Sequence, residues 1–104
     1  MSSKVVDVAE RQILRKDILS ILAETDEQGA TTKVLKAVLL KFGYSVSDLS
    51  VNLELKYLAG KDLVRMEIVA NQALGIKREV AHITSKGIDL LEGTIMVEGI
   101  EVGE

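Results

Sequence analysis

The sequence contains no cysteine, no proline and no tryptophan, and it has a single histidine. The absence of cysteine excludes disulfides, thiol nucleophiles and thiolate metal ligands. His82 has no second histidine or cysteine with which to share a metal, so we expect it to be structural. The glycine patterns of nucleotide-binding loops are also missing. We therefore expect a protein that is not an enzyme and that binds no cofactor and no metal.

Long hydrophobic runs are absent too. No segment approaches the roughly 18 apolar residues that cross a bilayer, and charges are scattered through the first sixteen residues, unlike a secretory signal. A chain of 104 residues with 47% hydrophobic and 28% charged residues is typical of one globular domain. We expect a single domain over residues 1–104, with residues 94–104 as an acidic tail, located in the cytoplasm and without a membrane partner.

The net charge of −3 is unevenly distributed. Residues 33–86 contain nine Lys or Arg against five Asp or Glu, whereas residues 89–104 contain five acids and no base. Phosphate affinity depends on where charge lies rather than on its sum. A weakly basic centre followed by an acidic tail is therefore compatible with binding to nucleic acid.

Three amphipathic helices are expected in the first sixty residues, because apolar residues recur there at helical spacing. These helices span about 7–24, 32–42 and 47–60. The apolar positions are Leu14, Ile18, Ile21 and Leu22 in the first, Leu35, Val38, Leu39 and Phe42 in the second, and Val51, Leu55 and Leu58 in the third. The residues that can cap the helix starts are Asp7 with Glu10, Thr31 or Thr32, and Ser45 or Ser47.

After the third helix, the spacing of apolar residues changes from a helical pattern to that of strands. In "LVRMEIV", Val64, Met66 and Ile68 alternate with charged residues, as in a half-buried strand, and "IKREVAHI" can return as its antiparallel partner. "TSKGIDLLEG" predicts a short last helix capped by Thr84, with Ile88 and Leu91 facing inward. The trailing "TIMVEGIEVGE" is expected to add a strand or to pair with another subunit.

The predicted order is three helices, a β-hairpin, a short helix and an extended tail. Three helices followed by a hairpin form the winged variant of the helix-turn-helix, in which the third helix is the recognition helix. The fold class expected is therefore α+β, mainly α, of winged helix-turn-helix type.

Two segments carry a family resemblance. "VNLELKYLAGKDLVRME" resembles the recognition helix of bacterial winged-helix regulators as it leads into the wing, with Asp62 where many of them have glycine. "ITSKGIDLLEG" resembles the segment that closes the wing. More narrowly, residues 10–102 are similar to small winged-helix proteins of Mu-like bacteriophages and prophages. This resemblance implies a phage or prophage origin in a bacterial host cell and a role related to DNA.

The third helix has two apolar faces. With about 100° per residue, Leu55 and Leu58 lie close to Val51, and a second apolar set lies on the opposite side. That set is Leu49, Leu53 and Tyr57, which we expect either to bind another protein or to pack within the subunit. The residues of this helix expected to reach the major groove of DNA are Ser50, Asn52 and Lys56.

Basic residues outside the third helix divide into two groups. Lys77 and Arg78 lie on the predicted wing, where basic side chains can follow the DNA backbone or enter the minor groove. The bases of the first two helices could contact phosphates or be ordinary solvated surface. They are Arg11, Arg15, Lys16, Lys33, Lys36 and Lys41.

Two functions remain open. The first is a small winged-helix protein that binds double-stranded DNA, as a homodimer, and acts as a phage-type transcription regulator or DNA-handling accessory. The second is a winged-helix module that binds a protein partner through the Leu53 side of the third helix and does not bind DNA.

Overall fold

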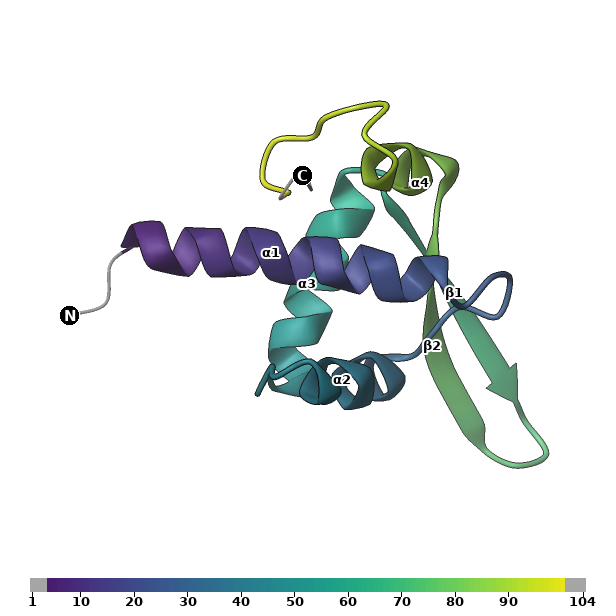
Figure 1. Ribbon diagram of the computed structural model, residues 1–104. Helices are drawn as coiled ribbons and strands as arrows, with labels where there is room; N and C mark the ends of the chain where they lie inside the picture. The colour runs from purple at the N-terminus through teal and green to yellow at the C-terminus, as the bar shows by residue number, and fades with distance from the viewer. Residues whose placement is uncertain (1–3, 101–104) are drawn as a thin grey trace.

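A computed structural model describes residues 4–100 of the chain, with side chains described from residue 7. The elements, in order, are α1 (Lys4–Ala23), α2 (Thr32–Lys41), α3 (Asp48–Gly60), β1 (Val64–Asn71), β2 (Ile76–Ile83) and α4 (Ser85–Leu91). Figure 1 shows α1 running across the molecule, with α2 and the hairpin on one side and α4 on the other. The predicted order of three helices, a hairpin and a short helix is confirmed.

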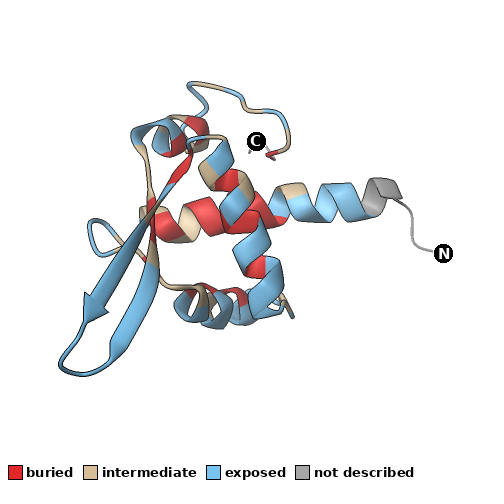
Figure 2. Ribbon diagram, turned by 180° about the vertical axis from the view of Figure 1, so that it is seen from behind, coloured by how far each residue is buried: buried red, intermediate tan, exposed pale blue. Residues whose placement is uncertain are grey.

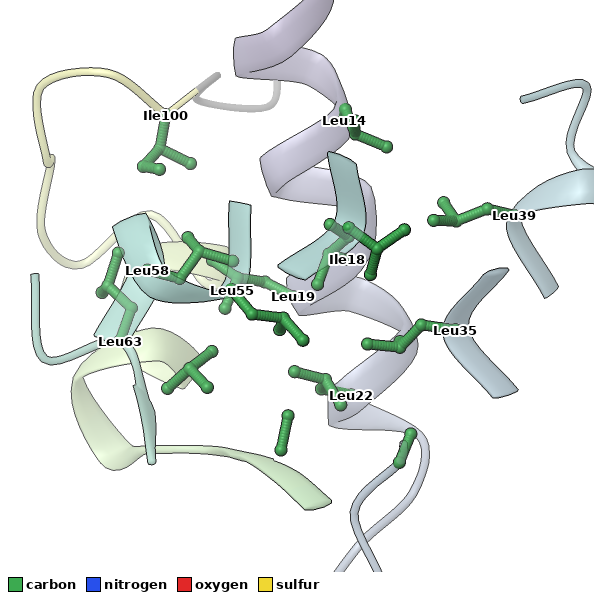
Figure 3. Packing of buried hydrophobic residues seen from close by; sticks show 14 of the residues in the cluster. Leu14, Ile18, Leu19, Leu22, Leu35, Leu39, Leu55, Leu58, Leu63 and Ile100 are labelled. Atoms are coloured by element: carbon green, nitrogen blue, oxygen red, sulfur yellow. The ribbon is translucent and has the colours of Figure 1, made fainter. Parts of the chain in front are cut away.

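The hydrophobic core forms around α1. Ile18, Leu19 and Leu22 are fully buried there, and they meet apolar side chains from α2 and α3 (Figure 3). The apolar positions predicted for α3 are confirmed, since Val51, Leu55 and Leu58 are all buried. Helical periodicity therefore identified most of the core, although Leu19 was not among the predicted positions.

Three helix starts are capped by hydroxyl side chains. Thr31, Ser47 and Thr84 each accept a hydrogen bond from a backbone N–H in the first turn of α2, α3 and α4. Such caps satisfy donors that the helix itself leaves free. The prediction for α1 was wrong, because this helix begins at Lys4 and Asp7 lies in its first turn rather than before it.

The chain turns sharply between α3 and β1. Asp62 has a φ of 64°, in the left-handed region that glycine adopts most easily. Thr84 steadies the turn, because its hydroxyl donates to the Asp62 carbonyl oxygen at 2.7 Å.

The hairpin β1–β2, called the wing below, is antiparallel from Val64 opposite Ile83 to Asn71 opposite Ile76. Only its base is buried, at Val64, Ala81 and His82. The outer half extends beyond the helices and is exposed on both faces (Figure 2). The prediction of a half-buried strand therefore holds for Val64 and fails for Ile68, which is 59% exposed.

A short segment before α2 is attached to the wing. Ala30 and Ala81 exchange two backbone hydrogen bonds of 2.9 and 2.8 Å. The preceding Gly29 has a φ of 68° and lies so close to Ala81 and His82 that a Cβ atom would collide with both. This contact requires glycine, and it fixes the start of α2 beside β2.

His82 lies on the wing beside this segment. It is buried, and its Nε2 lies 2.7 Å from Oε1 of Glu67 across the hairpin. Among the described residues there is no group of three side chains able to hold a metal ion. Through its burial and its contact with Glu67, His82 takes part in the packing at the base of the hairpin.

The segment 94–100, called the tail below, folds back over α1 and α3. Ile100 is buried in the core, and the carbonyl oxygen of Gly99 accepts from Nη1 of Arg15 at 2.8 Å. Tyr57 donates to the carbonyl oxygen of Glu98 at 3.2 Å. The expected strand is not formed within residues 94–100, because these contacts hold the segment in an irregular path.

A buried ion pair connects α1 to α3 beneath the tail. Nε of Arg15 lies 2.6 Å from Oε1 of Glu54, and Nε of Arg11 lies 3.0 Å from Oε2 of the same carboxylate. The Arg15 guanidinium also lies 3.7 Å from the centre of the Tyr57 ring. Arg15 and Glu54 are both buried, so each is the counter-charge that compensates the burial of the other.

Two inward-facing residues were predicted wrongly. Phe42 forms the C-cap of α2 and is 69% exposed, because the helix ends before its ring can turn to the core. Ile88 is 41% exposed, because α4 presents Gly87 and Leu90 to the core instead. A Cβ atom on Gly87 would collide with Leu63 and Ile83, so this close approach sets the rotation of α4.

Tyr44 joins the turn after α2 to α1. Its hydroxyl donates to Oδ2 of Asp17 at 2.6 Å. Burial, and after it the hydrogen bond and the negative charge of Asp17, raise the pKa of Tyr44 well above its ordinary value. The neutral phenol therefore stabilises this contact throughout the physiological pH range.

Candidate nucleic-acid interface

The exposed side of α3 faces away from the core and toward the wing. Ser50, Asn52 and Lys56 are all exposed. Asn52 and Lys56 line depressions beside the wing, whereas Ser50 lines neither of them. Ser50 lies in the first turn, where its backbone N–H donates to the Ser47 hydroxyl at 3.0 Å. All three predicted DNA-contacting residues of α3 are therefore accessible.

Asn52 lines a cleft between α2 and the wing, called the α2–wing cleft below. The cleft has a volume of about 350 Å³ and is lined by Thr31, Thr32, Lys33, Asn52, Lys77, Arg78 and Glu79. Three of the five predicted DNA-contacting residues thus line one cleft, although they are far apart in the sequence. The Ala30–Ala81 bridge explains this geometry, because it holds the first turn of α2 beside β2.

The amide of Asn52 is oriented by a neighbour. The Thr32 hydroxyl donates to Oδ1 of Asn52 at 2.5 Å. Because this bond occupies the carbonyl side of the amide, the NH₂ group is left to donate outward. An amide held in this way is suited to a base edge or a phosphate oxygen.

A second depression lies between α3 and the wing. It has a volume of about 260 Å³ and is lined by Leu49, Asn52, Leu53, Leu55, Lys56, Met66 and Glu79. Leu49 is 67% exposed and Leu53 is 51% exposed. Asn52 and Lys56, predicted to contact DNA, therefore lie on the same surface as Leu49 and Leu53, predicted to contact a protein partner.

Tyr57 does not share that surface. Its ring is half-buried between Arg15 and Lys61, and its hydroxyl bonds to the tail. Tyr57 lies one turn of α3 beyond Leu53, at the point where the tail covers the helix. The predicted set of Leu49, Leu53 and Tyr57 is thus divided between an exposed pair and an internally packed tyrosine.

The charge of this face is mainly positive. Within residues 7–100, no ion pair engages Lys33, Lys56, Lys77 or Arg78, and Glu79 is the single acid that lines either depression. Lys36, by contrast, lies 3.3 Å from Asp48 and is neutralised by it. Four bases without acidic partners favour an anionic ligand along the face formed by α2, α3 and the wing.

Two bases of α1, unlike those of this face, are paired with an acid. Arg15 is buried against Glu54, and Arg11 pairs with the same carboxylate. The suggestion that Arg15 could contact a phosphate was therefore wrong, since its guanidinium is committed to the interior. The spacing of the first helix gave no sign of this, because Glu54 lies 39 residues away.

The sequence did not single out Thr31 and Thr32 as cleft residues, and it gave Lys33 only as one of several scattered bases. Both threonines were identified as caps of α2, and that was their only visible signal. The first turn of a helix also presents free backbone N–H groups, which attract phosphate oxygens. A capping threonine with a lysine two residues later was thus a usable signal for a helix start that contacts an anion.

Solved structures with the same architecture identify the fold. A PadR-like transcription factor from Bacteroides fragilis superimposes with a TM-score of 0.75, at 21% identity over 88% of this chain and 85% of that chain. The chain has the winged-helix fold. The predicted fold class is therefore confirmed, with three helices, the β1–β2 hairpin and a short last helix in the expected order.

Two further winged-helix structures agree with this assignment. A PadR family transcription regulator from hypervirulent Clostridium difficile R20291 has a TM-score of 0.62, with 22% identity over 76% of this chain and 81% of that one. A protein from Thermoplasma acidophilum assigned as a transcriptional regulator has a TM-score of 0.56, with 25% identity over 69% and 68%. All three neighbours are described as transcription regulators.

Sequence comparisons give no closer assignment. No family model matches the chain, and no curated protein matches it either. The resemblance to Mu-like phage proteins is therefore not confirmed. The described helices include none that is both long and apolar enough to cross a membrane.

Proposed function

We propose that this winged-helix protein is a transcription regulator that binds double-stranded DNA, with α3 in the major groove and the wing along the adjacent backbone or minor groove. One observation carries the proposal: Asn52 of α3, the bases of the wing and the first turn of α2 line a single cleft. The likeness to PadR-type transcription factors supports it.

Each part of this face has a distinct role in the proposal. Lys77, Arg78 and Lys33 neutralise phosphates, and this positions the protein on the duplex. Asn52 and Lys56 donate to base edges in the major groove, with Ser50 at the start of the helix. Leu49 and Leu53 contact thymine methyl groups, which are the apolar feature of that groove. This last role gives exposed leucines a place on a DNA-reading helix.

Removing the two bases of the wing tests the phosphate contacts. Lys77→Ala/Arg78→Ala should weaken binding to any duplex, and it should lower the slope of log K against log salt by about two units, because each lost phosphate contact removes about 0.9. The measurement is fluorescence anisotropy with a labelled duplex of mixed sequence at several salt concentrations.

Lys86→Ala is the matched control, since this exposed lysine lies on α4, outside the α2–wing cleft. It should leave the slope within about 0.3 of the wild-type value. The proposal fails if the wild-type protein binds no duplex at about 100 μM and low salt, where ordinary non-specific affinity is measurable. It also fails if the control and the double variant lose affinity equally.

We further propose that the regulator is a homodimer. The N-terminal half of α1 extends away from the core (Figure 1) and carries Val8 and Ile13, which are 52% and 44% exposed. Pairing through this part of α1 would leave α3 free, and two copies could then contact half-sites about one helical turn apart. A phage-type regulatory role fits the same proposal, and the genes next to this one would test it.

The alternative function is a protein-binding module that uses the same face. It is favoured by the exposure of Leu49 and Leu53, because adjacent exposed leucines are typical of protein interfaces. Leu53→Lys separates the two functions. A protein complex formed through this face should dissociate, whereas non-specific DNA affinity should be kept or rise, because the variant adds a positive charge.

Sedimentation velocity and DNA anisotropy on the same Leu53→Lys sample give both answers. An oligomer that survives the substitution argues against an interface at Leu53. A loss of the oligomer, in a protein whose wild-type form binds no duplex, supports the protein-binding module on this face. Leu40→Lys is the control, because Leu40 is 65% exposed on α2 and lines neither depression of the candidate site.

A further inference from the structure

A groove lies between α1 and α2, separate from the α2–wing cleft. Its volume is about 720 Å³, and its lining shares no residue with that cleft. The lining residues are Asp17, Ser20, Ile21, Glu24, Thr25, Val34, Val38 and Phe42. This space is called the α1–α2 groove below.

One wall of the α1–α2 groove is an apolar stripe on α2. Val34, Val38 and Phe42 recur every four residues and so lie on one side of the helix. Phe42 is 69% exposed and Val34 is 49% exposed, although Phe42 is the only phenylalanine in the chain. Ile21 of α1 faces this stripe and is half-buried. An uncovered apolar wall of this kind is typical of a ligand-binding surface.

The opposite rim of the groove is acidic. Asp17 lies on α1, and Glu24 comes directly after Ala23, the last residue of that helix. No basic residue lines the groove. Asp17 lies beside the groove and accepts the Tyr44 hydroxyl. Glu24 is exposed and forms no ion pair among the described residues. The groove therefore attracts cations and repels anions.

The dimensions of the groove favour a small ligand over a protein. From Val34 to Phe42 the stripe spans nine residues, a rise of about 12 Å, which accommodates barely two turns of a partner helix. Its volume of about 720 Å³ lies within the roughly 300–1,000 Å³ typical of small-molecule sites.

We propose that the α1–α2 groove binds small lipophilic cations. The apolar part of the ligand would lie against Phe42, Val38 and Ile21, and its positive charge would lie between the carboxylates of Asp17 and Glu24. This inference does not depend on DNA binding. Because α2 lines both the groove and the α2–wing cleft, a bound ligand would contact the helix whose first turn faces the proposed DNA site.

Two ions of nearly equal size and shape but opposite charge test the proposal. Tetraphenylphosphonium should bind, and tetraphenylborate should bind at least about tenfold more weakly, because two carboxylates repel it. Isothermal titration calorimetry on the full chain measures both affinities. The Phe42 ring signals in an NMR titration should shift with the phosphonium ion.

Substitutions in the groove locate the binding. Glu24→Gln should lower the affinity for the phosphonium ion about threefold, since partly exposed ion pairs contribute modestly. Phe42→Ala should lower that affinity about tenfold, because it removes the largest apolar contact. The matched controls are Glu27→Gln and Leu40→Ala, which alter an exposed acid and an exposed apolar residue outside the groove. Both controls should bind as the wild-type protein does.

Circular dichroism confirms that each variant is folded before titration. Equal affinity for the two ions, or no binding of the phosphonium ion up to about 1 mM, which is the weak end of measurable affinity, would overturn the proposal. An equal loss of affinity in the control and groove variants would also overturn it, since the ion would then bind elsewhere.

Discussion

Glu54→Ala should lower the free energy of unfolding by about 3–5 kcal/mol, because it leaves a buried guanidinium without its counter-charge. Glu54 is 4% exposed and pairs with Arg15 at 2.6 Å and with Arg11 at 3.0 Å. In the variant, Arg15 keeps one acceptor, the Gly99 carbonyl oxygen, and a neutral carbonyl does not replace a carboxylate. We also expect the tail to detach more easily, since Arg15 holds it.

Urea unfolding followed by circular dichroism measures this effect. Arg11→Ala is the first control. It should lower the free energy of unfolding by less than about 1 kcal/mol, because exposed ion pairs contribute little and the Arg11 side chain is 57% exposed. The second control is Arg15→Leu/Glu54→Leu, which should be more stable than Glu54→Ala, since an apolar pair removes both buried charges. A Glu54→Ala midpoint equal to that of Arg11→Ala would contradict the assigned role of this pair.

Leu35→Ala should destabilise the fold by about 2–5 kcal/mol, the usual cost of truncating a fully buried leucine. Leu35 is 0% exposed and joins α2 to the core around α1. The loss combines the transfer free energy of the removed atoms with the cavity that they leave. Since α2 is short and supplies the first turn of the α2–wing cleft, the same substitution should also loosen the candidate DNA site.

Leu40→Ala on the same helix is the internal comparison. Leu40 is 65% exposed, so its loss should change the free energy of unfolding by no more than about 0.5 kcal/mol. Thermal unfolding of both variants should place Leu35→Ala at least about 10 °C below Leu40→Ala, because 1 kcal/mol corresponds to roughly 4–8 °C in a domain of this size. Similar melting temperatures would mean that α2 does not pack through Leu35.

The fold was largely predictable because its signals are local. Alternation and turn residues gave β2 its observed bounds, Ile76–Ile83, and capping hydroxyls marked the starts of three helices. The errors fell where distant residues decide the outcome. The rotation of α4 depends on a close approach between Gly87 and the Leu63 backbone. The spacing of apolar residues within one helix gives no information about such a contact with another segment.

The candidate site was predicted in part. Asn52, Lys77 and Arg78 were identified one by one from helix and wing positions, but their convergence depends on the Ala30–Ala81 bridge. No local pattern predicts such a bridge between single residues. The burial of Arg15 was hidden for a related reason, because an arginine on an amphipathic helix resembles a solvated base until its distant partner is known.

The tail contact also determines when the molecule can finish folding. Arg15 and Gly99 are 84 residues apart, and ribosomes add roughly 5–20 residues per second, so about 4–17 s separate the synthesis of the two partners. During that interval the emerging first helix has neither its carbonyl acceptor nor the side chain of Ile100 against it. The packing of α1 is therefore completed only after residues 99 and 100 have been synthesised and have left the exit tunnel.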